Sequence, residues 1–237
     1  MTIMTNPEVV TKFVADFKGY IEPCDQEKFV AFVHHLVQIE SPLRDISADT
    51  VMHGIVVASM GLLFSKTLSP VLLLALLGHD WDRACAEQAV RQEQFPEDQY
   101  DAYKKAHALQ SAKLFCAELR KFFDDSEMIE AVGALIKIHE EGGTPDAEII
   151  DVADAMSFFS PETTNWYRHE KVYKDKEGVP LPGVAQEERR KSGLTKKIKF
   201  MTLTLKEEHK TIIQEFIEKN SQDYSPEVLS ALDTMLN

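Results

Sequence analysis

The sequence of 237 residues predicts an all-α fold. Apolar residues recur at intervals of three and four along most of the chain, which is the spacing of an amphipathic helix. No segment shows the strict alternation of apolar and polar residues that indicates a half-buried strand. Pairs such as Ser69-Pro70 and Thr144-Pro145 mark helix starts, because proline is well tolerated in the first turn of a helix. We therefore expect a helical bundle.

Residues typical of helix starts, followed by apolar stripes, predict the helices of the first two thirds of the chain. Each expected helix begins at a proline, an acidic residue or a serine that stands just ahead of an apolar stripe. The first stripe runs from Val9 to Phe17 and predicts a buried face. The expected helices begin near Pro7, Gln26, Asp49, Pro70, Pro96, Ser126 and Ala147, and the last of these ends near Phe159.

The last third of the chain contains one long irregular stretch. Residues 174–188 include two glycines and two prolines, and we expect a loop there, since long loops in compact domains often serve as lids. Helices are expected beyond it at about 189–205, 207–219 and 226–236. We therefore expect a single all-α domain over residues 1–237, with a core at about 49–160 and a helical C-terminal extension at about 161–237.

Composition excludes several classes of partner. The net charge of -13 argues against a nucleic-acid partner, which requires a basic surface. Cys24, Cys85 and Cys116 are too few and too scattered for a disulfide framework or a cysteine metal site, and they indicate a reducing compartment. The N-terminal segment lacks the pattern of a signal peptide, and the longest apolar runs are shorter than the roughly 18–20 residues of a membrane span. We expect a cytoplasmic protein without a membrane partner, and its oligomeric state is left open.

Metal-binding side chains are set within apolar stretches of five expected helices. A buried imidazole or carboxylate is costly unless it is paired, and a metal ion would offset that cost for several of them together. Imidazole and carboxylate ligands suit iron, manganese or zinc. A histidine taken singly is more often a core residue, but the ordered set favours a metal site. The candidate ligands are His53, His79, Asp80, His107, His139 and Asp154.

The order His53, then His79-Asp80, then Asp154 resembles the HD-domain metal-dependent phosphohydrolase superfamily, which is named for its His-Asp pair. The resemblance covers about residues 49–159 and implies an HD-domain helical bundle. It also implies that these four side chains are the ligands of a first metal ion. Asp151 competes with Asp154 for the last place, because it lies three residues earlier on the same helix face.

Two further histidines indicate a second metal ion. The resemblance extends to a subset of the superfamily that binds two metal ions. In that subset, extra histidines lie between the His-Asp pair and the final aspartate, and the aspartate of the pair bridges the ions. His107 and His139 lie in that interval. The chain lacks the His-His pair and the Gly-Tyr-Pro sequence of the HD-GYP branch, so cyclic-dinucleotide phosphodiesterase activity is not expected. The expected cofactor is a pair of divalent ions of Fe, Mn, Mg or Co.

The resemblance implies metal-assisted hydrolysis of a phosphate ester on a nucleotide or another small phosphorylated metabolite. Asp80 would orient the ions, and Arg83 would bind the phosphoryl group and stabilise its charge. Lys104, one helical turn before a histidine ligand, is a second candidate for substrate binding. The alternatives are that Arg83 is a surface residue paired with Asp82 or Glu87, and that Lys104 is a solvated side chain.

Two other functions fit the same residues. The six-ligand set also resembles the HD-fold di-iron oxygenases, which cleave inositol or hydroxylated phosphonates with dioxygen, and ligand identity does not separate them from hydrolases. A non-catalytic HD domain that senses a ligand or mediates assembly is the other. The ligand set argues against it, because packing alone does not require six such groups. The basic segment 189–199 favours a phosphorylated substrate, although such a run is usually a solvated helix face.

Overall fold

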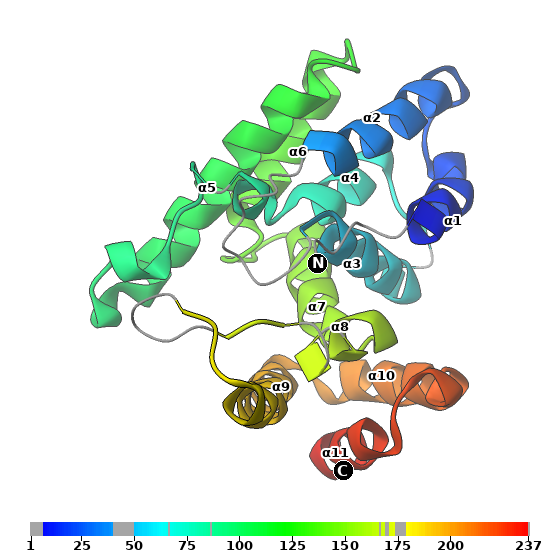
Figure 1. Ribbon diagram of the computed structural model, residues 1–237. Helices are drawn as coiled ribbons and strands as arrows, with labels where there is room; N and C mark the ends of the chain where they lie inside the picture. Colours follow the sequence, from blue (N-terminus) through cyan, green and yellow to red (C-terminus); the bar gives the residue numbers. More distant parts are fainter. Residues whose placement is uncertain are drawn as a thin grey trace. The chain divides into compact units, whose positions relative to one another are not determined.

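The computed structural model describes residues 7–39, 50–65, 67–85, 87–165, 167–168, 171–173 and 179–236. Within these ranges the chain forms eleven α-helices, joined by turns and short 3-10 helices, and no β-strand (Figure 1). The predicted all-α fold is confirmed. The expected helix start at Asp49 and residues 174–178 of the expected loop lie outside the described residues.

The chain divides into two compact units, Met1–Ala153 and Asp154–Asn237. The single domain, with its core at about 49–160 and its extension at about 161–237, stays a prediction, because two compact units can belong to one domain. The first unit contains α1 (Pro7–Phe17), α2 (Gln26–Ile39), α3 (Thr50–Ser65), α4 (Pro70–Gly78), α5 (Tyr100–Leu119), α6 (Ser126–Ile138) and most of α7 (Pro145–Ser157). The second contains the end of α7, α8 (Pro161–Asn165), α9 (Gly183–Thr204), α10 (Glu207–Lys219) and α11 (Pro226–Leu236).

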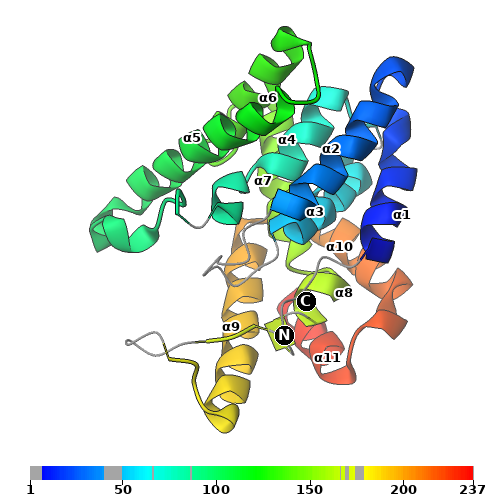
Figure 2. The same cartoon turned by 45° about the horizontal axis from the view of Figure 1, so that its top comes forward.

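Helix α4 is the apolar centre of the first unit. Its residues from Leu72 to Leu77 are at most 3% exposed, so this helix is buried on every side rather than along one stripe. It packs against α3 and α6, and α5 lies alongside α6, as Figures 1 and 2 both show. Its start agrees with the prediction: Pro70 opens the first turn, and the Ser69 hydroxyl accepts a hydrogen bond from the Leu72 amide at 3.1 Å.

Two glycines permit the close approach of α4 to its neighbours. A Cβ atom at Gly54 of α3 would lie 2.2 Å from the backbone oxygen of Leu77, and one at Gly78 would lie 2.4 Å from the Phe115 ring of α5. Only glycine fits at separations this short. His53 precedes Gly54 and the residue after Gly78 is His79, so the same close approach brings two of the candidate ligands together.

Two helix starts differ from the sequence expectation. A 3-10 helix, Glu97–Gln99, precedes α5, so the α-helix begins at Tyr100 rather than near Pro96. Helix α9 begins at Gly183 rather than near Arg189, so the end of the expected loop is helical. Pro182 is the residue just before this helix and has an extended backbone, with φ -65° and ψ 158°. The proline ring fixes φ near this value. Proline and glycine therefore mark a helix start here and not a continuing loop.

Helices α9, α10 and α11 build the second unit, where α11 packs against both α9 and α10. Ile198 of α9, Ile213 of α10 and Leu232 of α11 are almost fully buried. The Tyr224 hydroxyl donates a 2.6 Å hydrogen bond to the Phe159 carbonyl and so joins the segment before α11 to the segment after α7. None of the helices in the described part of the chain is both long enough and apolar enough to span a membrane.

Candidate metal centre

Four helices of the first unit bring five of the predicted ligands together. His53 lies in the first turn of α3, and His107 lies inside α5. His79 and His139 are the residues at which α4 and α6 end, and Asp80 follows His79 directly. The ring centroids of His53 and His79 are 5.1 Å apart, and those of His79 and His139 are 5.3 Å apart. Histidines from distant parts of the sequence therefore form one cluster.

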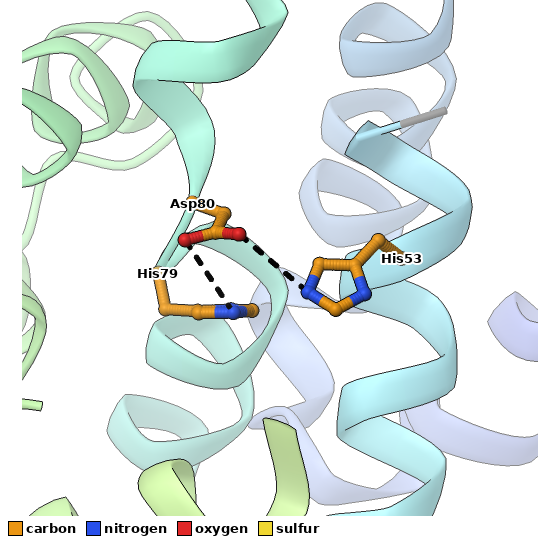
Figure 3. A group of neighbouring side chains, drawn as sticks. All are labelled: His53, His79 and Asp80. Atoms are coloured by element: carbon orange, nitrogen blue, oxygen red, sulfur yellow. Dashed lines mark ion pairs between the residues drawn. The ribbon is translucent and has the colours of Figure 1, made fainter. Parts of the chain in front are cut away.

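The Asp80 carboxylate stands at the centre of this cluster. His107 Nε2 lies 2.7 Å from Asp80 Oδ1, and His79 Nε2 lies 3.8 Å from the same oxygen. His53 Nε2 faces the other oxygen, Oδ2, at 3.6 Å, and Figure 3 shows this residue reaching Asp80 from the neighbouring helix. Asp80 thus belongs to two groups, His53–His79–Asp80 and Asp80–His107–His139, and within each group the possible ligand atoms all lie within 4.8 Å of one another. Each group can hold a metal ion.

Backbone carbonyls fix the orientation of two of the imidazoles. His79 Nδ1 donates to the Leu76 carbonyl at 3.0 Å, and His139 Nδ1 donates to the Ile136 carbonyl at 2.7 Å. A carbonyl oxygen only accepts, so Nδ1 carries a proton, and in the neutral ring the Nε2 atom has the lone pair. Histidines that bind metal ions usually have their second nitrogen engaged in this way. The donor set therefore fits a metal ion.

His107 has a carboxylate in place of a carbonyl at its Nδ1 atom. Asp82 Oδ1 lies 2.7 Å from His107 Nδ1, and both side chains are fully buried. The sequence reasoning considered Asp82 only as a possible partner of Arg83 and missed this contact. The one available signal was an acidic residue two positions after the His-Asp pair, and nothing in that pattern indicates that the two side chains meet.

Charges within the cluster shift three pKa values. Burial acts to raise the pKa of Asp80, but Arg83, His79 and His107 hold it well below its usual 3.8. Burial acts to lower the pKa of His107, but Asp80 and Asp82 raise it to about 9. Burial, with the neighbouring His79, lowers the pKa of His139 to about 4. Without metal, the His107 ring at pH 7 is therefore an imidazolium beside the ionised Asp80, and the His139 ring is neutral.

Arg83 forms an ion pair with the Asp80 carboxylate, and its side chain is 33% exposed. Burial raises the pKa of the nearby Tyr103 hydroxyl, and the Arg83 guanidinium acts against that rise. The Tyr103 ring in turn stacks on the His107 ring, with centroids 6.0 Å apart and planes inclined by 22°. The guanidinium is therefore part of the cluster, and its binding of a substrate phosphate stays a prediction.

Lys104 forms an ion pair with Glu140, with Nζ 2.5 Å from Oε2, directly beside His139. The side chain is 29% exposed. Lys104 and Glu140 line a surface hollow of about 500 Å³, together with Lys105 and Glu141. The hollow is lined by Glu140, the residue after His139, but by none of the five clustered side chains. The role of Lys104 in substrate binding stays a prediction.

Asp154 belongs to the second unit, because the division of the chain falls inside α7, between Ala153 and Asp154. The cluster in the first unit is therefore described by the other five side chains, and the metal-binding role of Asp154 stays a prediction. Asp151, its competitor, lies in the first unit and is exposed.

Comparisons with protein-family models, with curated proteins and with solved structures find no match. The chemical interpretation therefore depends on the cluster itself. Four imidazoles and one carboxylate, buried or nearly so, form two groups that share Asp80. Nitrogen and oxygen donors in this proportion suit first-row transition metals.

Proposed function

We propose that this chain is a metal-dependent phosphohydrolase of the HD superfamily, acting on a nucleotide or another small phosphorylated metabolite. The observation that carries the proposal is the Asp80 carboxylate, which lies between two histidine groups and also pairs with the Arg83 guanidinium. The proposal includes two divalent ions of Fe, Mn, Mg or Co, with Asp154 as a further ligand, and a cytoplasmic location. The net charge of -13 supports the expectation that nucleic acid is not the substrate.

Bound divalent ions supply a water of lowered pKa and neutralise charge on phosphoryl oxygens. Asp80, ionised because its pKa is held low, presents Oδ2 to His53 and Oδ1 to His107, one histidine of each group, and so orients both positions. In the structure, the Arg83 guanidinium neutralises the charge of the Asp80 carboxylate. Once cations share that task, its planar guanidinium can turn to two oxygens of a phosphoryl group, which a neutral side chain cannot bind in the same way.

The hollow lined by Glu140, the residue after His139, supports a small substrate. Its volume of about 500 Å³ lies within the range typical of small-molecule sites. Lys104 lines it and pairs with Glu140, the residue after His139, which supports the assignment of this lysine to a phosphorylated substrate. The Lys104–Glu140 ion pair would open when a substrate phosphate replaces the Glu140 carboxylate.

A second candidate is a di-iron oxygenase of the inositol or phosphonate type. Four of the five ligand-type side chains in the cluster are imidazoles, and imidazole suits iron better than magnesium. This composition favours iron over magnesium. A hydrolase tolerates the same metal, so the reaction must be determined by assay.

Metal analysis followed by two assays tests the proposal. Protein purified with and without oxygen should contain close to two metal ions per chain, and the variants His79→Ala and Asp80→Ala should lose most of them while keeping their helical content. His35→Ala is the matched control, because this histidine lies in the same unit but pairs with Glu118 at 2.7 Å, away from the cluster.

The loaded protein is then given a panel of nucleotides and sugar phosphates, scored by phosphate release. Release that depends on the metal supports the hydrolase. A silent panel, together with dioxygen consumption on inositol or hydroxylated phosphonates, would replace the hydrolase by the oxygenase. Protein that takes up no divalent ion would contradict both.

A further inference from the structure

We infer that Asp82 is a positioning residue that acts through His107 and sets the metal affinity of one position, the group Asp80–His107–His139. This inference deepens the proposed function and rests on its metal centre. It assigns a task to a residue that would neither bind a metal ion nor touch the substrate.

Every oxygen of the Asp82 side chain has a donor. Oδ1 lies 2.7 Å from His107 Nδ1 and accepts the Ser111 hydroxyl at 3.0 Å, while Oδ2 accepts the Val90 amide at 3.0 Å. The Ser111 oxygen also accepts the Asp82 amide at 3.1 Å. The carboxylate is thus fixed in one orientation, with Oδ1 held close to Nδ1 of the His107 ring.

Of these contacts, only the one with His107 benefits from the negative charge of Asp82. Burying a carboxylate costs free energy that neutral donors alone offset poorly. The amide oxygen of an asparagine could accept the Ser111 hydroxyl or the Val90 amide, so neither contact requires a negative charge. The imidazole does benefit, because a carboxylate at one ring nitrogen makes the other nitrogen a stronger ligand. That other nitrogen, Nε2, points at Asp80 Oδ1.

The two metal positions differ in this respect. His79 and His139 donate Nδ1 to neutral backbone carbonyls. Among the three histidines of the cluster whose Nδ1 partners are described, only His107 has a carboxylate there. Asp82 contacts His107, which belongs to one group and not to the other. Removal of its charge should therefore weaken one position and spare the position of His53 and His79.

Titration of metal-free protein with Co²⁺ tests this. Calorimetry and the visible absorption of bound Co²⁺ give two affinities for the wild-type chain. Asp82→Asn should lower one of them by about 10–100-fold and leave the other unchanged. Ser111→Ala is the matched control: it removes a neutral partner from the same buried cluster, keeps the contact between Asp82 and His107, and should leave the ratio of the two affinities unchanged.

Double variants identify the position. In a His107→Ala background, Asp82→Asn should have no further effect on Co²⁺ affinity, whereas in a His53→Ala background the full loss should remain. An equal loss at both positions, or no loss at either, would overturn the inference while leaving the metal centre in place. A wild-type chain that binds no Co²⁺ would overturn the proposed function and this inference with it.

A measurement on the wild-type chain keeps the test independent of variant folding. In protein labelled with ¹⁵N-histidine, His107 should have its Nδ1 protonated when Co²⁺ is replaced by diamagnetic Zn²⁺. Protonation at Nε2 in the loaded state would show that Asp82 does not act on the metal through this ring.

Discussion

Replacing Gly54 by alanine should destabilise the first unit and weaken metal binding together. The added Cβ atom would lie 2.2 Å from the Leu77 backbone oxygen, whereas real Cβ atoms essentially never approach another atom within 3.0 Å. The difference between these two distances, about 0.8 Å, is the least by which α3 and α4 must separate. Both partners belong to helix backbones, so neither can turn away as a flexible side chain would.

The expected magnitude follows from two opposing effects. Overpacking of a core costs about 1–3 kcal/mol, and a clash with backbone belongs near the upper end of that range. Alanine in a helix is favoured over glycine by about 1 kcal/mol, which offsets part of the cost. The free energy of unfolding should therefore fall by about 2 kcal/mol. His53 precedes the substituted residue, so its distance of 3.6 Å from Asp80 should grow and the affinity of that metal position should fall as well.

Urea denaturation of metal-free protein and Co²⁺ titration measure the two effects. Gly19→Ala is the matched control, because a Cβ atom at Gly19 meets nothing within 4 Å. Its free energy of unfolding should stay within about 0.5 kcal/mol of the wild-type value. If Gly54→Ala is as stable as Gly19→Ala and binds Co²⁺ as tightly as the wild type, the close approach of α3 and α4 is not what holds His53 in place.

Three further predictions concern the proton balance, the substrate and the fold. Burial acts to lower the pKa of His107, but the neighbouring carboxylates raise it to about 9. Metal binding below that pH must therefore displace a proton from the ring. The affinity for the metal ion should rise about tenfold per pH unit up to about pH 9. Calorimetry in buffers of different ionisation enthalpy counts the proton, and an affinity independent of pH between 6 and 8 would contradict the assignment. Arg83→Ala should keep both metal ions but lower kcat/KM for phosphate release by about 100-fold, as the loss of one charge-stabilising donor does; loss of metal instead would make Arg83 a structural partner of the centre. Ser69→Ala removes the acceptor of the Leu72 amide and should lower the free energy of unfolding by about 1 kcal/mol in urea, with no change in metal content.

Local patterns in the sequence predicted the helices and drew attention to the ligands. Ser69-Pro70 marked the start of α4, and the pair His79-Asp80 drew attention because metal-binding side chains follow an apolar stretch there. The contact of Asp82 with His107 could not be predicted in the same way. It joins residues on separate elements and depends on the register between α5 and the segment after α4, which packing sets and periodicity does not encode.

The start of α9 was misplaced for a related reason. Gly183 and the prolines before it favour a loop when only their local preferences are considered. In the structure Pro182 takes the backbone of a residue before a helix, and apolar side chains later in α9, such as Leu194 and Ile198, are buried in the second unit. Tertiary burial stabilises the helix, and the first turn extends from it despite a glycine.

The imidazole rings of His79 and His139 each have two roles: one nitrogen contacts the end of a helix, and the other is available to a metal ion. Each is the residue at which a helix ends, and each donates its Nδ1 hydrogen to a carbonyl of the last turn. The carbonyl ends of α4 and α6 carry partial negative charge, which cations stabilise. A cation held by the opposite nitrogen of each ring would therefore tighten the last turns of both helices. Amide hydrogen exchange at residues 76–80 and 136–140 should slow when the centre is filled, so the helix ends themselves report its occupancy in the absence of any substrate.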